Sequence, residues 1–239
     1  MQRREPIPDD IMEIGLMPGT ARTPREKANQ DLFRIFGPLT RARYMSAHRT
    51  ASPETILALV KTIDQSLEQW AASVPDEYAF STVPASPGQN ALYGVYHLYS
   101  DHHIARLWNG YRMGSITNAT NMVHLAALIN TPEVLPDLAT ALDRQRQMSV
   151  DLCNSVPYYD LRPPMTAIVG HNILWPLYCV ATAGNVLPYV RRWALQRMHY
   201  ISMCTATMQG VQIADALARQ CEVTVWERAG EVEDESREW

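Results

Sequence analysis

Apolar positions recur at helical spacing through most of the chain, and short proline-rich stretches separate them. The clearest stripe is formed by Ile56, Val60, Ile63, Leu67 and Trp70. Steps of three or four residues place such a set on one face of a single helix. The stripe therefore predicts an amphipathic helix whose apolar face lies in a core.

This predicted helix also has a clear start signal. Ser52 can cap its N-terminus, Pro53 suits the first helical position, and Glu54 complements the positive end of the helix dipole. At the other end, residues 73–90 hold Pro75, Pro84, Pro87 and Gly88 and should form a loop, either a lid or disordered.

The same reasoning predicts further helices along the chain. Asn90 can cap a long helix that runs from Ala91 to Arg112. Pro38 should kink or end the first helix, and Pro176 should kink an apolar central helix, leaving a backbone carbonyl free one turn earlier. The other predicted helices span residues 30–44, 118–130, 136–153, 166–183 and 188–210, the last with a continuation to 219, and residues 156–165 form a connector.

These elements give an all-α fold, an irregular multi-helix assembly in a single domain. Residues 1–30 are polar and proline-rich and are expected to be a mobile N-terminal arm. Residues 31–226 form the helical domain. Residues 227–239 form an acidic tail that should be solvated.

Composition weighs against several classes of partner. The net charge is −4 and the isoelectric point is about 6.0, whereas a DNA-binding domain usually has a basic surface. The N-terminus lacks a secretory apolar segment, and the most apolar run, 173–184, is shorter than the ~18–20 residues that span a bilayer. We therefore expect an intracellular protein, cytoplasmic or, if it is a regulator, nuclear, without a nucleic-acid or membrane partner.

The cysteines and the missing motifs bear on cofactors. Cys153, Cys179, Cys204 and Cys221 are unevenly spaced and contain no C-x-x-C pair, so we expect buried reduced thiols. The sequence has no G-x-G-x-x-G, Walker loop, G-x-S-x-G elbow or D-D-x-x-D run. We therefore expect no cofactor and no metal.

Four short segments in the second half of the chain occur in a particular order. They are 151–157 (DLCNSVP), 173–178 (ILWPLY), 192–193 (RW) and 210–214 (GVQIA). The set resembles the fungal-specific transcription-factor domain, the helical region that follows a zinc-cluster DNA-binding module. Two segments nearer the N-terminus fit the same pattern, 70–75 and 105–112, so the resemblance covers roughly residues 52–217.

The resemblance implies a helical regulatory domain, but one part of the family pattern is missing. The family's zinc cluster needs six closely spaced cysteines near the N-terminus, and residues 1–60 contain none. This route to DNA is therefore not expected here. What remains is a helical region that, in the family, is thought to regulate or to sense small molecules.

His171 and Asn172 stand where the family is usually apolar. Burying either side chain without a partner costs on the order of 1–3 kcal/mol, so each needs a partner. Neighbouring helices could satisfy both. Alternatively they line a cavity, with His171 as the catalytic acid or base and Asn172 as a hydrogen-bond donor to a carbonyl.

A second polar cluster lies on the predicted helix 91–112. His97 and Asp101 are four residues apart and would share a face, and Tyr96 and His103 could reach the same interior. The alternatives are a metal site, which needs three convergent ligands, surface polar residues, or a His–Asp pair that tunes one imidazole.

Aromatic residues give a third candidate feature. Most of them should be core, but a group that includes Trp175 and Tyr178 could surround an apolar ligand such as a terpenoid or polyketide.

Two functions follow as hypotheses. In one, the chain is a DNA-binding-deficient regulator or a ligand-sensing, partner-binding module. In the other, which we favour, the helical domain is a stand-alone protein of natural-product biosynthesis. It would bind a small apolar organic intermediate and promote a cofactor-free cyclisation, isomerisation or pericyclic (Diels–Alder-type) step, chiefly by holding the substrate in its reactive conformation. Tyr96, His97, Asp101, His103, Trp175 and Tyr178 would then bind the substrate around His171 and Asn172.

Overall fold

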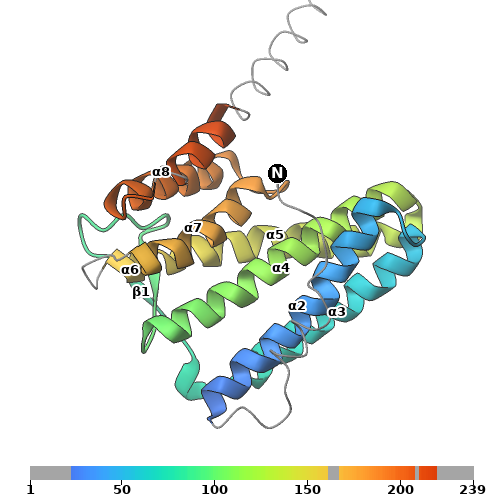
Figure 1. The fold of residues 1–239 in the computed structure, drawn as a ribbon, viewed down its shortest axis with the longest axis horizontal. Helices are drawn as coiled ribbons and strands as arrows, with labels where there is room; N and C mark the ends of the chain where they lie inside the picture. Colours follow the sequence, from blue (N-terminus) through green and yellow to red (C-terminus); the bar gives the residue numbers. More distant parts are fainter. Residues whose placement is uncertain (1–22, 161–166, 208–209, 220–239) are drawn as a thin grey trace, which may run out of the picture.

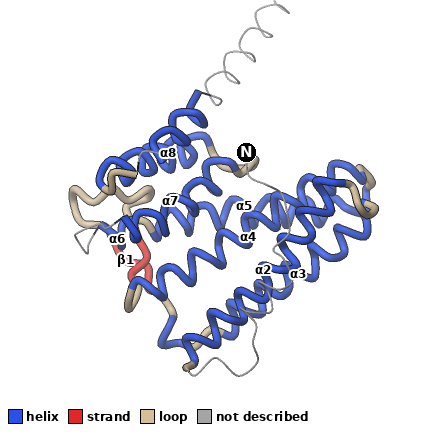
Figure 2. The backbone as a smooth tube through the Cα atoms, viewed as in Figure 1, coloured by secondary structure: helices blue, strands red, loops and turns tan. Residues whose placement is uncertain are grey.

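The computed structural model describes residues 23–160, 167–207 and 210–219. Within this part of the chain the structure is mostly helical, and the sheet consists of two short strands (Figure 2). The all-α prediction is confirmed. In Figure 1 the long helix α4 lies in the middle, with the pair α2 and α3 on one side and the pair α7 and α8 on the other.

The first described helix begins earlier than the sequence pattern predicted. Helix α2 spans Pro24–His48, and Thr23 and Glu26 form a reciprocal capping box at its start. Residues 24–30, predicted to belong to a mobile arm, are therefore helical, and the predicted arm before Thr23 lies outside the described residues. Pro38 lies inside the helix and does not end it.

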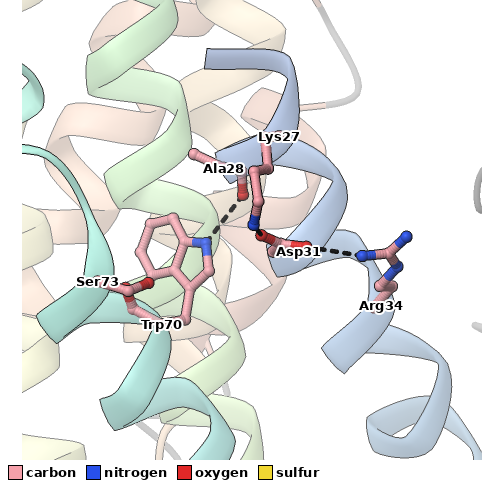
Figure 3. Close-up of polar contacts among 6 residues, drawn as sticks. All are labelled: Lys27, Ala28, Asp31, Arg34, Trp70 and Ser73. Atoms are coloured by element: carbon pink, nitrogen blue, oxygen red, sulfur yellow. Dashed lines mark hydrogen bonds and ion pairs between the residues drawn. The ribbon is translucent and has the colours of Figure 1, made fainter. Parts of the chain in front are cut away.

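Helix α3 (Pro53–Ser73) matches its prediction. The Ser52 hydroxyl accepts a hydrogen bond from the backbone N–H of Thr55, and the whole predicted apolar stripe is buried. At the end of the helix the Trp70 indole N–H donates to the carbonyl of Ala28 at 2.8 Å, as Figure 3 shows beside the Lys27–Asp31–Arg34 ion pairs. This bond joins the end of α3 to the first turns of α2.

The segment after α3 was predicted wrongly. Instead of a long loop and a helix from Ala91, the structure has a 3₁₀ turn (Asp76–Tyr78) and two antiparallel strands, β1 (Ser81–Pro84) and β2 (Val95–Leu98). Gly94 precedes β2 with a φ of 69°, a conformation that glycine adopts without strain and that a helix cannot contain. The backbone N–H of Ala85 donates to the Gly94 carbonyl and closes the strand pair.

Helix α4 (His102–Ile129) joins what the sequence pattern had predicted as two helices. Asp101 caps it, and 15 of its 28 residues are buried because α2, α3, α5 and α7 all pack on it. Its buried polar residues occur at every third position. Because an α-helix has 3.6 residues per turn, each is rotated from the one before it around the helix axis, so they face different neighbouring helices. They are Asn109, Arg112, Ser115, Asn118 and Asn121.

The remaining helices cover α4 from the other side. A 3₁₀ turn (Pro132–Val134) leads into α5 (Leu135–Ser155), and the predicted connector contains a single helical turn, α6 (Pro157–Asp160). The apolar central helix is α7 (Ala167–Thr182), with Pro176 inside it.

The last predicted helix is interrupted. Helix α8 (Pro188–Cys204) begins at the predicted proline but ends before Gly210, because Ala206 takes a left-handed φ of 53°. Residues 210–219 form a separate helix, and the acidic tail lies outside the described residues. No helix in the described part of the chain is long and apolar enough to cross a membrane.

The cysteines agree only in part with the expected buried thiols. Those with described side chains are all free, and Cys153 is buried, Cys179 is half-buried and Cys204 is exposed on the last turn of α8. The expectation of burial is therefore wrong for Cys204, and Cys221 lies outside the described residues.

Candidate functional site

A groove of about 660 Å³ lies over α4, with α2 on one side and α7 on the other. This volume lies within the range of about 300–1,000 Å³ that is usual for small-molecule sites. Figure 1 shows the three helices that form it. The groove residues come from α2 (Phe36, Leu39, Thr40, Arg43, Ser46, Ala47), α4 (Met113, Gly114, Ile116, Thr117, Thr120, Asn121, His124) and the α7 region (Trp175, Tyr178, Cys179, Thr182, Ala183).

Three aromatic side chains form part of the apolar lining of the groove. Trp175 and Tyr178 stack with ring centroids 5.1 Å apart, and Phe36 lies across from them on α2. The Trp175 side chain stays 40% exposed although it is one of the largest apolar groups in the chain. A stacked pair with one exposed ring and one half-buried ring, at the border of a hollow of this size, is a platform on which a flat or apolar ligand could lie.

The groove also has polar lining residues, and none of the described ones carries a negative charge. Asn121 is only 8% exposed, and its Nδ2 donor finds no hydrogen-bond partner among the described residues. Arg43 and His124 also line the groove, and no acidic residue is among its described lining residues. Burial raises the pKa of the Cys179 thiol to about 12, and the nearby Arg43 guanidinium offsets only part of that rise. Cys179 is therefore a neutral thiol here, not a nucleophile.

A smaller recess of about 230 Å³ adjoins the groove. It is lined by Asn172, Trp175 and Pro176 from α7 and by Arg106, Asn109, Gly110 and Met113 from α4. Met113 and Trp175 line both the recess and the groove, so the two hollows are adjacent at these side chains. Because Pro176 has no N–H, the Asn172 carbonyl loses its usual helical donor beside the recess.

These hollows contain part of the predicted site. Asn172 lines the recess, Tyr178 lines the groove and Trp175 lines both. His171 belongs to α7, but its side chain lies outside the described residues, so the predicted acid or base stays a prediction. The groove has both polar and apolar lining residues.

His97 lies elsewhere, in a buried network under the hairpin. Its side chain is 3% exposed, and its Nδ1 lies 3.0 Å from Arg112 Nη2. Arg112 is 1% exposed and also donates to the Tyr99 hydroxyl at 2.6 Å and to Asn109 Oδ1 at 3.0 Å, while its guanidinium lies over the Phe80 ring. The described hydrogen-bond partners of this buried cation include no carboxylate.

The protonation state of His97 follows from these contacts. Arginine can only donate, so Nδ1 must be the acceptor and the imidazole must be neutral. Burial, and then the charge of Arg112, lower the pKa of His97 to about 3. The predicted pairing of His97 with Asp101 on one helix face is wrong, because His97 is in β2 and Asp101 precedes α4.

Asp101 and His103 have structural partners at the start of α4. Asp101 accepts from the backbone N–H of Ile104 and pairs with Arg25 at 2.7 Å. Burial acts to raise the pKa of Asp101, but these two contacts outweigh it and the pKa is lowered. Burial and then Arg106 lower the pKa of His103.

Tyr96 is also away from the hollows. It is half-buried in β2, opposite Val83, and neither it nor His97, Asp101 or His103 lines the groove or the recess. Within the described part of the chain, no group of three or more His, Cys, Asp or Glu side chains could hold a metal ion.

The sequence reasoning missed most of the groove residues, and Arg43 and Asn121 are the two that matter most for its chemistry. Asn121 had a signal, because Asn118 and Asn121 stand three residues apart in an otherwise apolar segment. Arg43 had none, since an arginine on the polar face of a helix is ordinary.

Comparison of the chain with protein-family models, with curated proteins and with solved structures found no match. The resemblance to the fungal regulatory domain therefore stays a prediction.

Proposed function

We propose that this protein binds a small organic molecule in the groove between α2, α4 and α7. The single observation that carries the proposal is the Trp175–Tyr178 stack, with Trp175 exposed, beside a hollow of ligand size. The ligand would have a flat or apolar body, a class that includes the terpenoids and polyketides expected from the sequence.

The test uses N-phenyl-1-naphthylamine, an uncharged aromatic dye whose fluorescence rises in apolar sites. We expect saturable binding to the native protein. Replacing Trp175 by Ala removes half of the aromatic platform, worth on the order of 1 kcal/mol or more, so the dissociation constant should rise about tenfold.

The matched control is Tyr200→Ala. Tyr200 is an exposed aromatic residue on α8 that does not line the groove, so its loss should leave dye binding unchanged. If Trp175→Ala binds the dye as tightly as the native protein, or if both variants weaken it equally, the groove is not the binding site.

Catalysis of a cofactor-free cyclisation, isomerisation or pericyclic step is a second candidate. It is favoured by Asn172, which lines the recess next to the ligand platform and could donate to a substrate carbonyl. Citronellal is a suitable probe, because its conversion to isopulegol is an intramolecular cyclisation. A carbon–carbon bond forms at the carbonyl carbon, and an allylic hydrogen moves to the carbonyl oxygen.

We expect the native protein to accelerate this conversion over buffer and to change the ratio of isomers, and Asn172→Leu to lose both effects. Chiral gas chromatography measures rate and ratio together. If the native protein gives the same rate and ratio as buffer, the catalytic candidate fails. Dye binding without turnover would favour the ligand-sensing alternative.

A further inference from the structure

The groove has one buried donor that nothing in the described structure satisfies. Asn121 projects from α4, is more than nine-tenths buried, and its Nδ2 has no acceptor. A buried amide N–H without a partner is costly, and native structures seldom retain one without a reason. Because Asn121 also lines the groove, a ligand atom there could supply the missing acceptor.

The surroundings of Asn121 favour a negatively charged acceptor. Arg43 of α2 lines the same groove and forms none of the ion pairs found among the described residues. His124 lies one turn further along α4 from Asn121 and also lines the groove. No described lining residue carries a negative charge that would repel an anion.

The positions of Arg43 and Asn121 along their helices place them at the same end of the groove. The close approaches of Gly110 to Leu32 and of Gly114 to Phe36 show that α2 and α4 run side by side in register. Both Arg43 and Asn121 lie further along these helices and line the same groove, so we expect Arg43 to lie near the turn that holds Asn121. The Trp175–Tyr178 platform supplies the apolar wall opposite.

We infer that the ligand of the groove is an organic acid, whose carboxylate accepts from Asn121 Nδ2 and pairs with Arg43 while its apolar body lies on the Trp175–Tyr178 platform. This inference rests on the proposed function and adds the chemical class of the ligand. A monocarboxylate suits the site better than a phosphate, because one guanidinium and one amide match the two oxygens of a single carboxylate.

The experiment compares two competitors with the same ring system, 2-naphthoate and 2-naphthamide, which differ in charge but scarcely in shape. Each displaces N-phenyl-1-naphthylamine from the full chain at pH 7.5. We expect the acid to displace the dye at about one tenth of the concentration that the amide needs, because a charge-assisted hydrogen bond replaces a neutral one.

Three variants assign this preference to the two residues. Asn121→Leu and Arg43→Gln should each reduce the advantage of the acid to about threefold or less, whereas Arg43→Lys should keep most of it. Asn121→Leu should fold at least as stably as the native protein, because it removes an unsatisfied buried donor. Urea denaturation of every variant checks this point.

The outcomes separate the two proposals. If the dye binds but acid and amide displace it equally, the organic-acid inference is wrong and the binding groove stands. If the acid is preferred but the preference survives both Asn121→Leu and Arg43→Gln, its carboxylate lies elsewhere and the inference is again wrong. If the dye does not bind to the native protein, both proposals fail.

Discussion

Acidification should destabilise this protein through a single buried imidazole. His97 is 3% exposed and accepts a hydrogen bond from Arg112, so its neutral form is built into the fold. Its pKa is about 3 in the folded protein, against an ordinary value near 6.5 in an unfolded chain. Between these two values the unfolded chain binds more protons, and stability must therefore fall as the pH falls.

The size of the effect follows from the same two pKa values. Between the two pKa values, the free energy of unfolding falls by about 1.4 kcal/mol for each pH unit below 6.5. Lowering the pH from 7 to 5 should therefore cost about 2 kcal/mol from His97 alone. This loss is a sizeable fraction of the 5–15 kcal/mol by which domains are usually stable.

Urea denaturation, followed by circular dichroism at 222 nm, measures the free energy of unfolding at pH 7, 6 and 5. Asn at position 97 offers an oxygen close to where Nδ1 lies, so His97→Asn keeps the acceptor for Arg112 but does not titrate. Other groups with lowered pKa values, such as Asp101 and His103, contribute equally to both proteins. The difference between the two pH profiles isolates His97, and parallel profiles would refute the assignment of a buried neutral imidazole held by Arg112.

Three further predictions concern other parts of the fold. Trp70→Phe removes the indole donor to the Ala28 carbonyl and part of a buried ring, so the free energy of unfolding should fall by about 2 kcal/mol. Urea denaturation measures this change, and an unchanged midpoint would contradict the role of the hydrogen bond. Gly114→Ala should lower the free energy of unfolding by about 1–3 kcal/mol, because the new Cβ would lie 2.8 Å from the Phe36 ring of α2. Gly184→Ala should have little effect, because no atom lies within 4 Å of its new Cβ, and equal changes in the two variants would contradict the close contact. Iodoacetamide should alkylate exposed Cys204 well before the buried thiol of α5, as peptide mapping by mass spectrometry would show, and the reverse order would place Cys204 in the core.

The helices that the sequence predicted best are those with both a periodic stripe and a terminal signal. Helix α3 has the Ser52 cap, a proline at its first position and a stripe ending at Trp70, and these local features agree with its packing. Helix α2 shows the limit of this reasoning. Its Thr23–Glu26 capping box was present in the sequence, but the prolines nearby made the segment look extended.

The hairpin and the start of α4 were missed for a different reason. Asn90 was taken as a helix cap, although Gly94 would weaken any helix that followed by about 1 kcal/mol. The strands are short and pair with a partner ten or more residues away, and such pairing leaves little local trace. Asp101, taken as a site residue, is the true cap.

The candidate site was predicted only where it lies on α7. Asn172, Trp175 and Tyr178 stood out because a polar residue, exposed aromatics and a proline occur together in an apolar helix. The opposite wall, with Arg43 and Asn121, depends on how α2 and α4 pack. Nothing in the sequence specifies that arrangement residue by residue.

Helix α4 touches four other helices, and its buried polar side chains serve different neighbours in turn. Arg112 donates to His97 of β2, and Asn109 donates to the Tyr159 hydroxyl of α6. Asn118 donates to the Val60 carbonyl of α3, and Asn121 lines the groove. If any of the helices packed on α4 separated from it, α4 would lose contacts that water would then have to replace. The molecule should therefore melt as one cooperative unit, so that an occupant of the groove would protect the distant hairpin as much as the helices it touches.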